Sequence, residues 1–431
     1  MKHRGRHRRQ KRGRAVRAFL AGTALALTAA ATMISASQAT VTVNPGALKP
    51  LTSAADTAPL RLKEELVPQR TLDRLSAAMG RPTGVSSVLD SAERDLRDAI
   101  DCTPGERRAL PVAPTATAAY CWDADDTRSW RPGAVTTSGD ADDDGRWGAH
   151  RVILSAWSRT GTAADDGGLA RVAFVNADDR GRLSYAWVLL AVPVDGGNDF
   201  RGLVSQVSGM VWYQDKLLVT AGGTGEDAVY VYDMDRVQRA TVNSGAVGRV
   251  RGGWSAHGAR WVLPAVGSYR MTGQEGAVHP DYLSLDRSTR PDSLVASDWV
   301  STADDRDARL WRYDFSSSPA RAGLLATDAK GYSRVTEAYE TKAPGSGPVL
   351  SYASRWYLAR SADSGDERGT LWRQDLSGAK ATRCGEDADT RTCWSTGAES
   401  LSYWEETGEV WSQSGRTLFA TPLASLDRAM K

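Results

Sequence analysis

A strand-like hexapeptide occurs three times in this chain, with its aromatic residues in register. The copies are Val229-Tyr-Val-Tyr-Asp-Met234, Leu310-Trp-Arg-Tyr-Asp-Phe315 and Leu371-Trp-Arg-Gln-Asp-Leu376. Alternate residues of a strand point to the same face, so each copy gathers its large side chains on one side, although the third has Gln374 between Trp372 and Leu376. Such a face cannot be buried by one strand alone. The repeat therefore predicts β-units that stack on one another.

From residue 120 onward the chain is typical of short strands separated by Gly, Asp and Ser turns. A meander of three or four strands repeated around a ring is a propeller blade. The candidate blades are Ala134–Ala177, Met210–Met234, Tyr282–Phe315, Val349–Leu376 and Leu401–Leu423. We predict an all-β fold, a β-propeller of five or six blades. The irregular spacing of the repeats keeps a pair of β-sandwiches as the alternative.

Two further segments concern how the ring is completed. Trp261–Tyr269 is interpreted as the inner strand of the third blade or as part of a sixth. Either Ala109–Val112 or Thr117–Trp122 is expected to join the last blade and close the ring.

Residues 1–39 have the composition of a secretory signal peptide. Nine Lys and Arg residues and no acid lie between Lys2 and Arg17, an apolar run extends from Ala18 to Ile34, and Ser37-Gln-Ala39 offers small residues for cleavage. The apolar run is about as long as the shortest membrane-spanning helix, so an uncleaved anchor is the alternative. We predict a secreted protein, extracellular or attached to the cell envelope, with no membrane span after cleavage.

Residues 40–119 contain no Phe, Trp or Tyr, whereas all 15 Trp and all 13 Tyr lie between Tyr120 and Trp411. A segment without large apolar side chains cannot easily build its own core. We interpret it as a flexible lead-in, Thr40 to Pro59, followed by two helices, Leu72–Met79 and about 87–100. The helical arm is expected to dock on the domain formed by residues 120–431. A free, disordered stalk is the alternative.

The charge of the exported chain argues against partners that need a basic surface. Without the nine basic residues of the leader, 45 of the 54 Lys and Arg residues remain against 52 acids, a formal charge of −7. Binding to nucleic acid or to anionic lipid is therefore not expected. We expect a monomer whose partner is a glycan or a protein surface.

Four cysteines in an exported protein are typical of disulfides. Proximity in the sequence favours Cys102–Cys121 and Cys384–Cys393, one of three possible pairings. Neither pair has the spacing of a zinc site.

Motifs from residue 120 onward resemble those of secreted actinobacterial proteins that carry a propeller-like domain and have no assigned chemistry. The resemblance rests on five segments that span most of residues 120–411: Cys121–Asp142, His150–Trp157, Gly209–Tyr213, Ser284–Leu294 and Glu399–Trp404. It implies a propeller and export, and no catalytic residue. In these relatives we expect Gln before the glycine that corresponds to Gly133 and His near Gln206. This chain has Pro132 at the first position and departs at both.

Asp140, Asp142 and Asp144, with Gly145, form the opening of a calcium-binding loop. Alternating carboxylates on a tight turn can present several oxygens to one hard cation. The ninth and twelfth positions are Gly148 and Arg151 rather than ligands. Calcium is the one cofactor that the sequence suggests; a solvated hairpin loop is the alternative.

Three residues are candidates for ligand binding. Glu399 precedes an apolar strand, where a propeller can present polar groups to its central channel, and Asp298 and Asp304–Asp305 are further acids that could converge there. His150 precedes a strand, so a role as a hydrogen-bonded strand-entry residue is the alternative. Trp130 lies beside a turn and could stack on a sugar, as could Trp147 and Trp394, although most tryptophans are expected in the blade cores.

No catalytic motif is present: the sequence lacks Gly-x-Ser-x-Gly, His-Glu-x-x-His and a phosphate-binding Gly-Lys loop. The sequence therefore favours a secreted binding or scaffold module over an enzyme. The alternative is a calcium-dependent hydrolase of the lactonase or phytase kind, with its site in the propeller channel.

Overall fold

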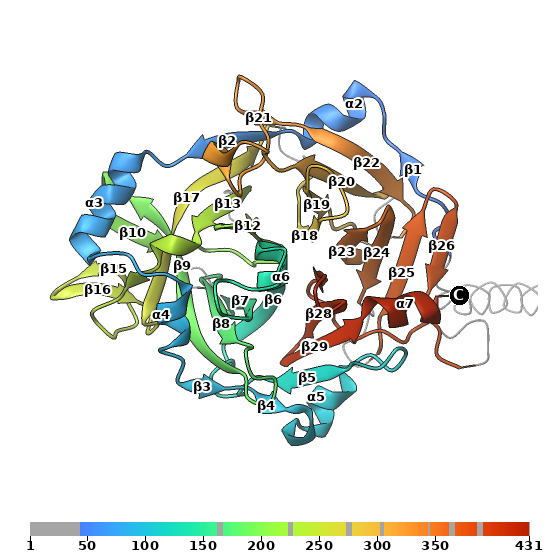
Figure 1. Cartoon of the computed structure of the whole chain (residues 1–431), viewed down its shortest axis with the longest axis horizontal. Helices are drawn as coiled ribbons and strands as arrows, with labels where there is room; N and C mark the ends of the chain where they lie inside the picture. The colour runs from blue at the N-terminus through green and yellow to red at the C-terminus, as the bar shows by residue number, and fades with distance from the viewer. Residues whose placement is uncertain are drawn as a thin grey trace, which may run out of the picture. The chain divides into compact units, whose positions relative to one another are not determined.

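The computed structural model describes residues 44–161, 167–222, 227–272, 278–301, 306–343, 345–361, 367–385 and 391–430, which belong to one compact unit, Asn44–Lys431. The predicted signal peptide lies outside the described residues. Antiparallel strands within this unit form five successive meanders arranged in a ring (Figure 1), so the protein is a five-bladed β-propeller.

Each blade is a set of four antiparallel strands, of which the first three are consecutive in the meander. Blade 1 consists of β6 (Trp130–Thr137), β7 (Val152–Arg159), β8 (Ala170–Asn176) and β9 (Ser184–Val194). Blade 2 consists of β11 (Met210–Tyr213), β12 (Lys216–Ala221), β13 (Ala228–Asp233) and β17 (Trp261–Met271). Blade 3 consists of β18 (Tyr282–Asp286), β19 (Ser293–Ser297), β20 (Ala308–Asp314) and β22 (Val335–Thr341). Blade 4 consists of β23 (Ser346–Tyr352), β24 (Arg355–Arg360), β25 (Thr370–Asp375) and β26 (Gly378–Ala381), and blade 5 of β27 (Ser402–Trp404), β28 (Glu409–Ser414), β29 (Thr417–Pro422) and β5 (Ala118–Cys121).

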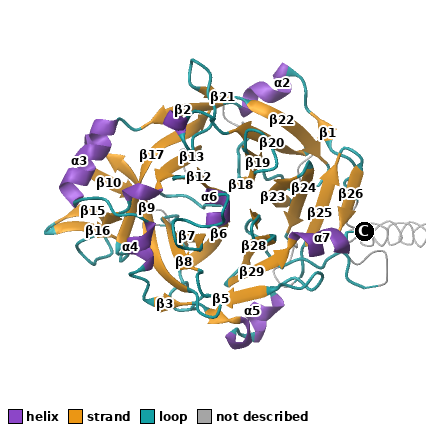
Figure 2. Cartoon of the chain, viewed as in Figure 1, coloured by secondary structure: helices purple, strands orange, loops and turns teal. Residues whose placement is uncertain are grey.

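Smaller elements decorate these blades. They are β10 (Asp199–Gly202), β14 (Gln238–Arg239), the hairpin β15 (Val247–Val250) and β16 (Gly253–Ala256), β21 (Tyr332–Ser333), and the helices α6 (Ser138–Ala141) and α7 (Leu423–Ala429). Helices lie mainly at the outer edge, whereas α6 lies near the centre of the ring (Figure 2).

The repeated hexapeptide forms the third strand of three consecutive blades, β13, β20 and β25. Its alternating faces pack into different interfaces: Tyr230 and Tyr232 contact blade 1, whereas Val229 and Val231 contact blade 3. The third copy differs from expectation at its end, because Leu376 is 62% exposed. Gln374 is buried, and its Nε2 donates to the carbonyl oxygen of Gly46 (2.9 Å).

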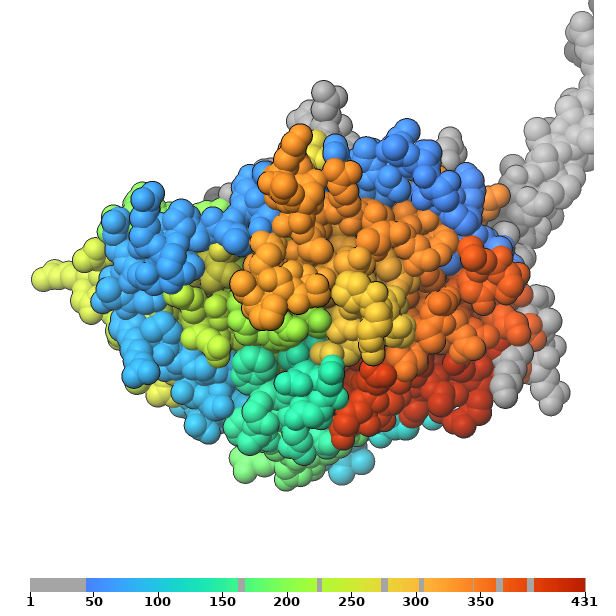
Figure 3. All heavy atoms as spheres, turned by 45° about the horizontal axis from the view of Figure 1, so that its top comes forward, coloured from blue at the N-terminus to red at the C-terminus, as the bar shows by residue number. Residues whose placement is uncertain are grey.

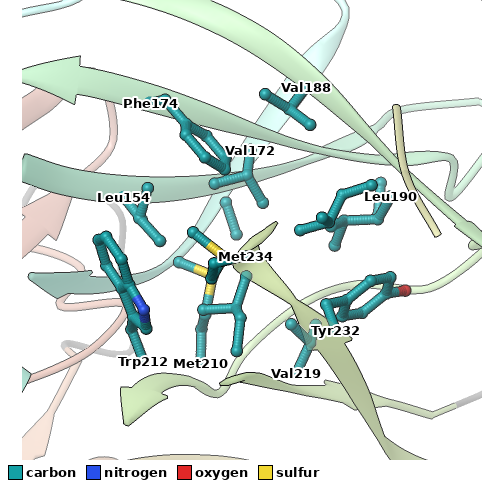
Figure 4. Close-up of a cluster of buried hydrophobic side chains, with 14 of the residues drawn as sticks. Leu154, Val172, Phe174, Val188, Leu190, Met210, Trp212, Val219, Tyr232 and Met234 are labelled. Atoms are coloured by element: carbon teal, nitrogen blue, oxygen red, sulfur yellow. The ribbon is translucent and has the colours of Figure 1, made fainter. Parts of the chain in front are cut away.

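Five buried apolar clusters lie between neighbouring blades, one at each of the five blade interfaces of the ring. The cluster between blades 1 and 2, which includes Phe174, Trp212 and Met234, is shown in Figure 4. Equivalent clusters lie between blades 2 and 3, 3 and 4, 4 and 5, and 5 and 1. Because every blade buries both faces against its neighbours, the β-sandwich alternative does not apply.

The ring is closed by the second of the two predicted strands. β5 pairs with β29 in the register Tyr120 opposite Leu418, so an N-terminal strand forms the outer edge of the last blade. The interpretation of Trp261–Tyr269 was wrong. This segment belongs to β17, the outer strand of blade 2, whose first residues also pair in parallel with β9 of blade 1.

Residues 44–117 form a belt around the outside of the ring (Figures 1 and 3). β1 (Lys49–Pro50) pairs with β22 of blade 3, β2 (Leu62–Leu66) with β17 of blade 2, β3 (Arg94–Asp95) with β9 of blade 1, and β4 (Arg97–Asp98) with β5 of blade 5. The helices of the belt are α2 (Ala54–Thr57), α3 (Gln69–Met79), α4 (Val85–Leu89) and α5 (Pro104–Arg108). The belt thus pairs with outer strands that would otherwise be exposed edges.

The belt corrects two expectations. Asn44 to Pro59 is not a flexible lead-in, because it contributes β1 and α2. The predicted helix over 87–100 ends at Leu89, and the chain then forms β3 and β4. Leu96 is buried while Ile100 is 82% exposed, so the helical spacing of these residues does not correspond to a buried helix face.

Both expected disulfides are formed. Cys102 bonds to Cys121 across a sequence separation of 19 residues, and Cys384 to Cys393 across 9 residues. The first joins the belt to the strand that closes the ring. Disulfides of this kind fit an extracellular protein.

Replacing Cys102 and Cys121 together by alanine is expected to lower the free energy of unfolding by about 3 kcal/mol, because the unfolded chain regains the entropy of an open loop. Denaturant unfolding would measure this loss. Replacing Cys384 and Cys393 is the matched control, with a loss of about 2–3 kcal/mol. Loss of the Cys102–Cys121 disulfide should increase amide hydrogen exchange in β5 and β29, whereas loss of Cys384–Cys393 should not. Equal exchange in the two double variants would contradict a role of Cys102–Cys121 in ring closure.

Candidate functional site

The starts of the five inner strands contribute a set of residues that we call the channel mouth: Arg131, Gln206, Tyr282, Gly347 and Glu399. Each residue comes from a different blade. Arg131, Tyr282 and Gly347 lie at the first or second position of β6, β18 and β23, and Gln206 and Glu399 shortly precede β11 and β27. The first strands of neighbouring blades contact one another around the ring axis, which brings these positions together.

Direct contacts link several of these side chains. The Nη1 of Arg131 donates to the Oε1 of Gln206 at 3.0 Å. The ring of Tyr282 lies directly on Gly347, where a Cβ atom would come within 2.5 Å of a ring carbon. A residue with a side chain at position 347 would therefore displace the Tyr282 ring from the channel mouth.

Glu399 is the titratable group at the centre of this set. Its backbone N–H donates to the carbonyl oxygen of Gln413 (2.9 Å), and among the described residues its carboxyl group has no hydrogen-bond partner. Burial raises the pKa of Glu399 to about 7, against the opposing charge of Arg131. Burial and the nearby Glu399 also raise the pKa of Tyr282. Glu399 therefore changes its charge close to neutral pH.

A cavity of about 530 Å³ opens beside Arg131, Gln206 and Tyr282. Its other walls include Asp281 and Trp299. The backbone N–H of Trp299 donates to the Oδ2 of Asp281 (2.7 Å), which fixes the loop that carries the indole. Trp299 is 51% exposed, and burial raises the pKa of Asp281 to about 6. An exposed aromatic face thus borders a polar cavity.

The opposite end of the channel is covered by α6, which contacts β11 of blade 2 and β27 of blade 5. Asp140 on this helix is 3% exposed, and its Oδ2 accepts hydrogen bonds from Thr136 Oγ1 (2.6 Å) and Ser402 Oγ (2.8 Å). Burial raises the pKa of Asp140 to about 6. The polar residues of this end bind one another, whereas Arg131, Gln206 and Tyr282 of the channel mouth line a cavity.

The predicted calcium loop is not formed. Asp140 points into the fold from α6, while Asp142 and Asp144 are exposed. Within the described ranges, the group of ligand atoms close enough to share a metal is Cys102, Glu106 and Cys121, and its two sulfurs are joined in a disulfide. Asp140, Asp142 and Asp144 are therefore not arranged to share a calcium ion. The alternative of a calcium-dependent hydrolase is left without the ligands predicted for it.

His150 lies at the end of blade 1 opposite the channel mouth, because β6 and β7 are antiparallel. Its Nδ1 is 2.8 Å from the Oδ2 of Asp178, and the N–H of Arg151 donates to the Oδ1 of the same residue (2.7 Å). This is the hydrogen-bonded arrangement at a strand entry. The structure does not bring His150 and Glu399 together.

The three tryptophans singled out from the sequence have different surroundings. Trp394 is fully buried against Phe419, and Trp147 packs on Trp212 with ring centroids 5.1 Å apart. These two are not exposed stacking surfaces. Trp130 lines a cavity distinct from the one at the channel mouth.

The further acids do not join Glu399. Asp298 is 1% exposed and accepts hydrogen bonds from the Nη1 of Arg306 (2.5 Å) and the backbone N–H of Arg309 (2.6 Å). Asp304–Asp305 lie outside the described residues.

Sequence reasoning missed Arg131, Tyr282 and Trp299, which belong to no local motif. Their position at the start of an inner strand or beside it was the available signal.

No family model and no curated protein matches the chain. Among solved structures, a subtype N11 neuraminidase-like protein of A/flat-faced bat/Peru aligns with 62% of this chain and 83% of its own, at 10% identity and a TM-score of 0.23. The AtxE2 isopeptidase in its apo form aligns with 68% of this chain and 52% of its own, at 10% identity and a TM-score of 0.18. Scores this low do not establish a shared fold; the propeller rests on the strand pairing and the five blade interfaces.

The described ranges contain no helix with the length and apolar character needed to cross a membrane.

Proposed function

We propose that this protein is a secreted binding module of the cell envelope or extracellular space, which holds a glycan at the channel mouth. The observation that carries the proposal is the half-exposed indole of Trp299 beside a polar cavity. Flat aromatic faces stack on sugar rings, and hydroxyl groups need polar partners. Gln206, Asp281 and Tyr282 on the cavity wall supply such partners.

Isothermal titration with neutral trisaccharides of glucose, mannose and N-acetylglucosamine tests this proposal. We expect at least one trisaccharide to bind, and Trp299→Ala to weaken that binding at least tenfold by removing the stacking surface. Leu376→Ala is the matched control, because Leu376 is another exposed large apolar side chain, 62% exposed, on blade 4. Absence of binding by all three sugars, or an unchanged affinity in Trp299→Ala, would overturn the proposal.

The affinity should also depend on pH through Asp281 on the cavity wall. With a pKa of about 6, Asp281 is mostly neutral at about pH 5 and mostly ionised at about pH 7. A carboxylate accepts hydrogen bonds from hydroxyl groups more strongly than a carboxylic acid does, so the sugar should bind about fivefold more tightly at the higher pH. In Asp281→Asn this pH dependence should disappear. Asp195→Asn, at an exposed acid of blade 1, is the control and should keep it.

Glu399, outside this cavity wall, predicts how stability varies with pH without ligand. The folded state raises the pKa of Glu399 from 4.5 to about 7, so it binds the proton more tightly than the unfolded chain. Stability should therefore fall as the pH rises between these two values. The difference in thermal midpoint between the wild type and Glu399→Gln isolates this part; a constant difference across the range would contradict the pKa assignment.

A further inference from the structure

A second cavity, of about 640 Å³, lies on blade 1 and shares no lining residue with the cavity at the channel mouth. Its wall contains Arg171, from the start of β8, which is 9% exposed. The guanidinium group is held between two indoles, 3.8 Å from the ring centroid of Trp130 and 3.5 Å from that of Trp187. The two rings fix the plane of the guanidinium and leave only its edges for hydrogen bonds.

Arg171 has few partners for a buried cation. Its Nη2 donates to the backbone oxygen of Asp126 (2.8 Å), while its Nε is buried without a hydrogen-bond partner. Among the described residues no carboxylate lies within 4.0 Å of the guanidinium. The nearest acid, Asp126, is already engaged: its Oδ2 accepts from Tyr185 (2.7 Å) and Trp187 (2.8 Å) and pairs with Arg94 (3.1 Å).

The remaining charges of the cavity wall leave a positive excess. Arg260 pairs with Glu93 at 3.2 Å, and Asp125 pairs with Arg128 outside the cavity. Arg239 also lines the cavity, is exposed, and has no ion-pair partner among the described residues. Burial lowers the pKa of Arg171 to about 9, which still leaves the group protonated at neutral pH. A buried cation without a counter-ion is costly unless an anion reaches it.

The other residues that line the cavity indicate the size and polarity of the rest of the ligand. Several are small and apolar, and of these Ala240, Val242 and Ala259 are partly exposed. The volume falls in the range that holds a small organic molecule rather than a bare ion. The two indoles cover both faces of the Arg171 guanidinium and leave a narrow edge, which a planar carboxylate fits better than a tetrahedral phosphonate does.

We propose that this cavity binds a small organic carboxylate, with its apolar body against the alanine-rich wall and its carboxylate on the free edge of Arg171. Arg239 at the opening adds a second, solvent-exposed attraction. The proposal is independent of glycan binding at the channel mouth.

A matched series of three probes tests this proposal by isothermal titration at about pH 8: phenylacetate, its neutral isostere phenylacetamide, and the dianion benzylphosphonate. Phenylacetate should bind at least tenfold more tightly than phenylacetamide, and more tightly than benzylphosphonate. Equal binding of phenylacetate and phenylacetamide, or absence of binding by phenylacetate, would overturn the proposal. Tighter binding of benzylphosphonate would overturn the assignment to a carboxylate.

Variants separate binding from folding. Arg171→Met should reduce phenylacetate affinity at least tenfold while leaving the thermal midpoint unchanged or raised, since replacing an unpaired buried charge by an apolar chain removes its desolvation cost. Arg239→Gln, at an exposed position, should fold normally and weaken binding severalfold, with Arg249→Gln outside the cavity as its control. Unchanged affinity in both Arg171→Met and Arg239→Gln would overturn the proposal. Trp299→Ala should leave phenylacetate binding intact, which distinguishes this cavity from the channel mouth.

Discussion

A variant that begins at Gln69 is expected to lose most of its folding stability and to aggregate. It lacks β1 and β2, which pair with β22 and β17, and the buried leucines Leu48, Leu51, Leu60 and Leu62. Burial of one leucine side chain contributes about 2 kcal/mol, so four contribute about 8 kcal/mol, against a typical total of about 5–15 kcal/mol. The loss also exposes the edges of two blades to pairing with other chains.

Thermal unfolding and size-exclusion chromatography would measure this effect. The matched control begins at Asn44 and keeps the whole belt. It should unfold cooperatively as a soluble protein, whereas the shorter variant should unfold at a much lower temperature or elute as aggregates. A shorter variant that stays soluble and has the same thermal midpoint as the control would show that the belt does not stabilise the ring.

Asp286→Ala is expected to lower the free energy of unfolding by about 4 kcal/mol, as found when one partner of a buried ion pair is removed. Asp286 is fully buried at the end of β18. Its Oδ2 accepts from the Nη1 of Arg312 (3.0 Å) in the same blade and from the Oγ of Ser351 (2.7 Å) in blade 4. The substitution leaves Arg312 with Glu337 as its carboxylate partner, whose Oε2 lies 2.7 Å from the Nε of Arg312, and removes the hydrogen bond from Ser351 that joins blades 3 and 4. Urea unfolding would measure the loss.

Asp314→Ala provides a matched control, because Asp314 ends β20 at a partly exposed position and accepts one hydrogen bond, from the Oγ1 of Thr336 (3.1 Å). Its loss should be at most about 1 kcal/mol. Adding Arg312→Met to Asp286→Ala should recover part of the stability, since it removes a buried charge that has lost its buried partner and leaves only the partly exposed Glu337 unpaired. Equal losses in the two single variants would contradict the assigned role of Asp286.

Residue patterns predicted the local features of this protein well. Alternation within the hexapeptides correctly placed three strands, because that signal lies within six consecutive residues. The same method failed at 87–100. The helical spacing of apolar residues predicted one helix there, whereas the fold places these residues in α4, β3 and β4 and the turns between them. Here pairing with neighbouring strands outweighs the helical preference of the segment. Similarly, the absence of aromatic residues from 40–119 indicated a segment without its own core. It did not show that the apolar side chains of this segment pack into the clusters between the five blades.

For the candidate sites, the sequence singled out Glu399 because it precedes an apolar strand and Trp130 because it lies beside a turn, and their ligand-binding roles stay predictions. Their surroundings could not be predicted. The channel mouth draws one residue from each of five blades, and the carboxylate cavity places Arg171 between two tryptophans that lie far from it in sequence. The acids Asp140, Asp142 and Asp144 show the converse: close spacing suggested a shared ion, whereas the backbone turn at α6 directs Asp140 inward and leaves the other two exposed.

The amino-acid order by itself therefore indicated the strands of the hexapeptides and the repeat of blades, and favoured the disulfide pairs that form, because each depends on residues that are near neighbours or equivalent copies. The number of blades, the path of the belt and the composition of both cavities depended on the tertiary structure. Closing a ring brings together side chains separated by hundreds of residues, and burial then sets their charge and hydrogen-bond requirements in ways that no local pattern records.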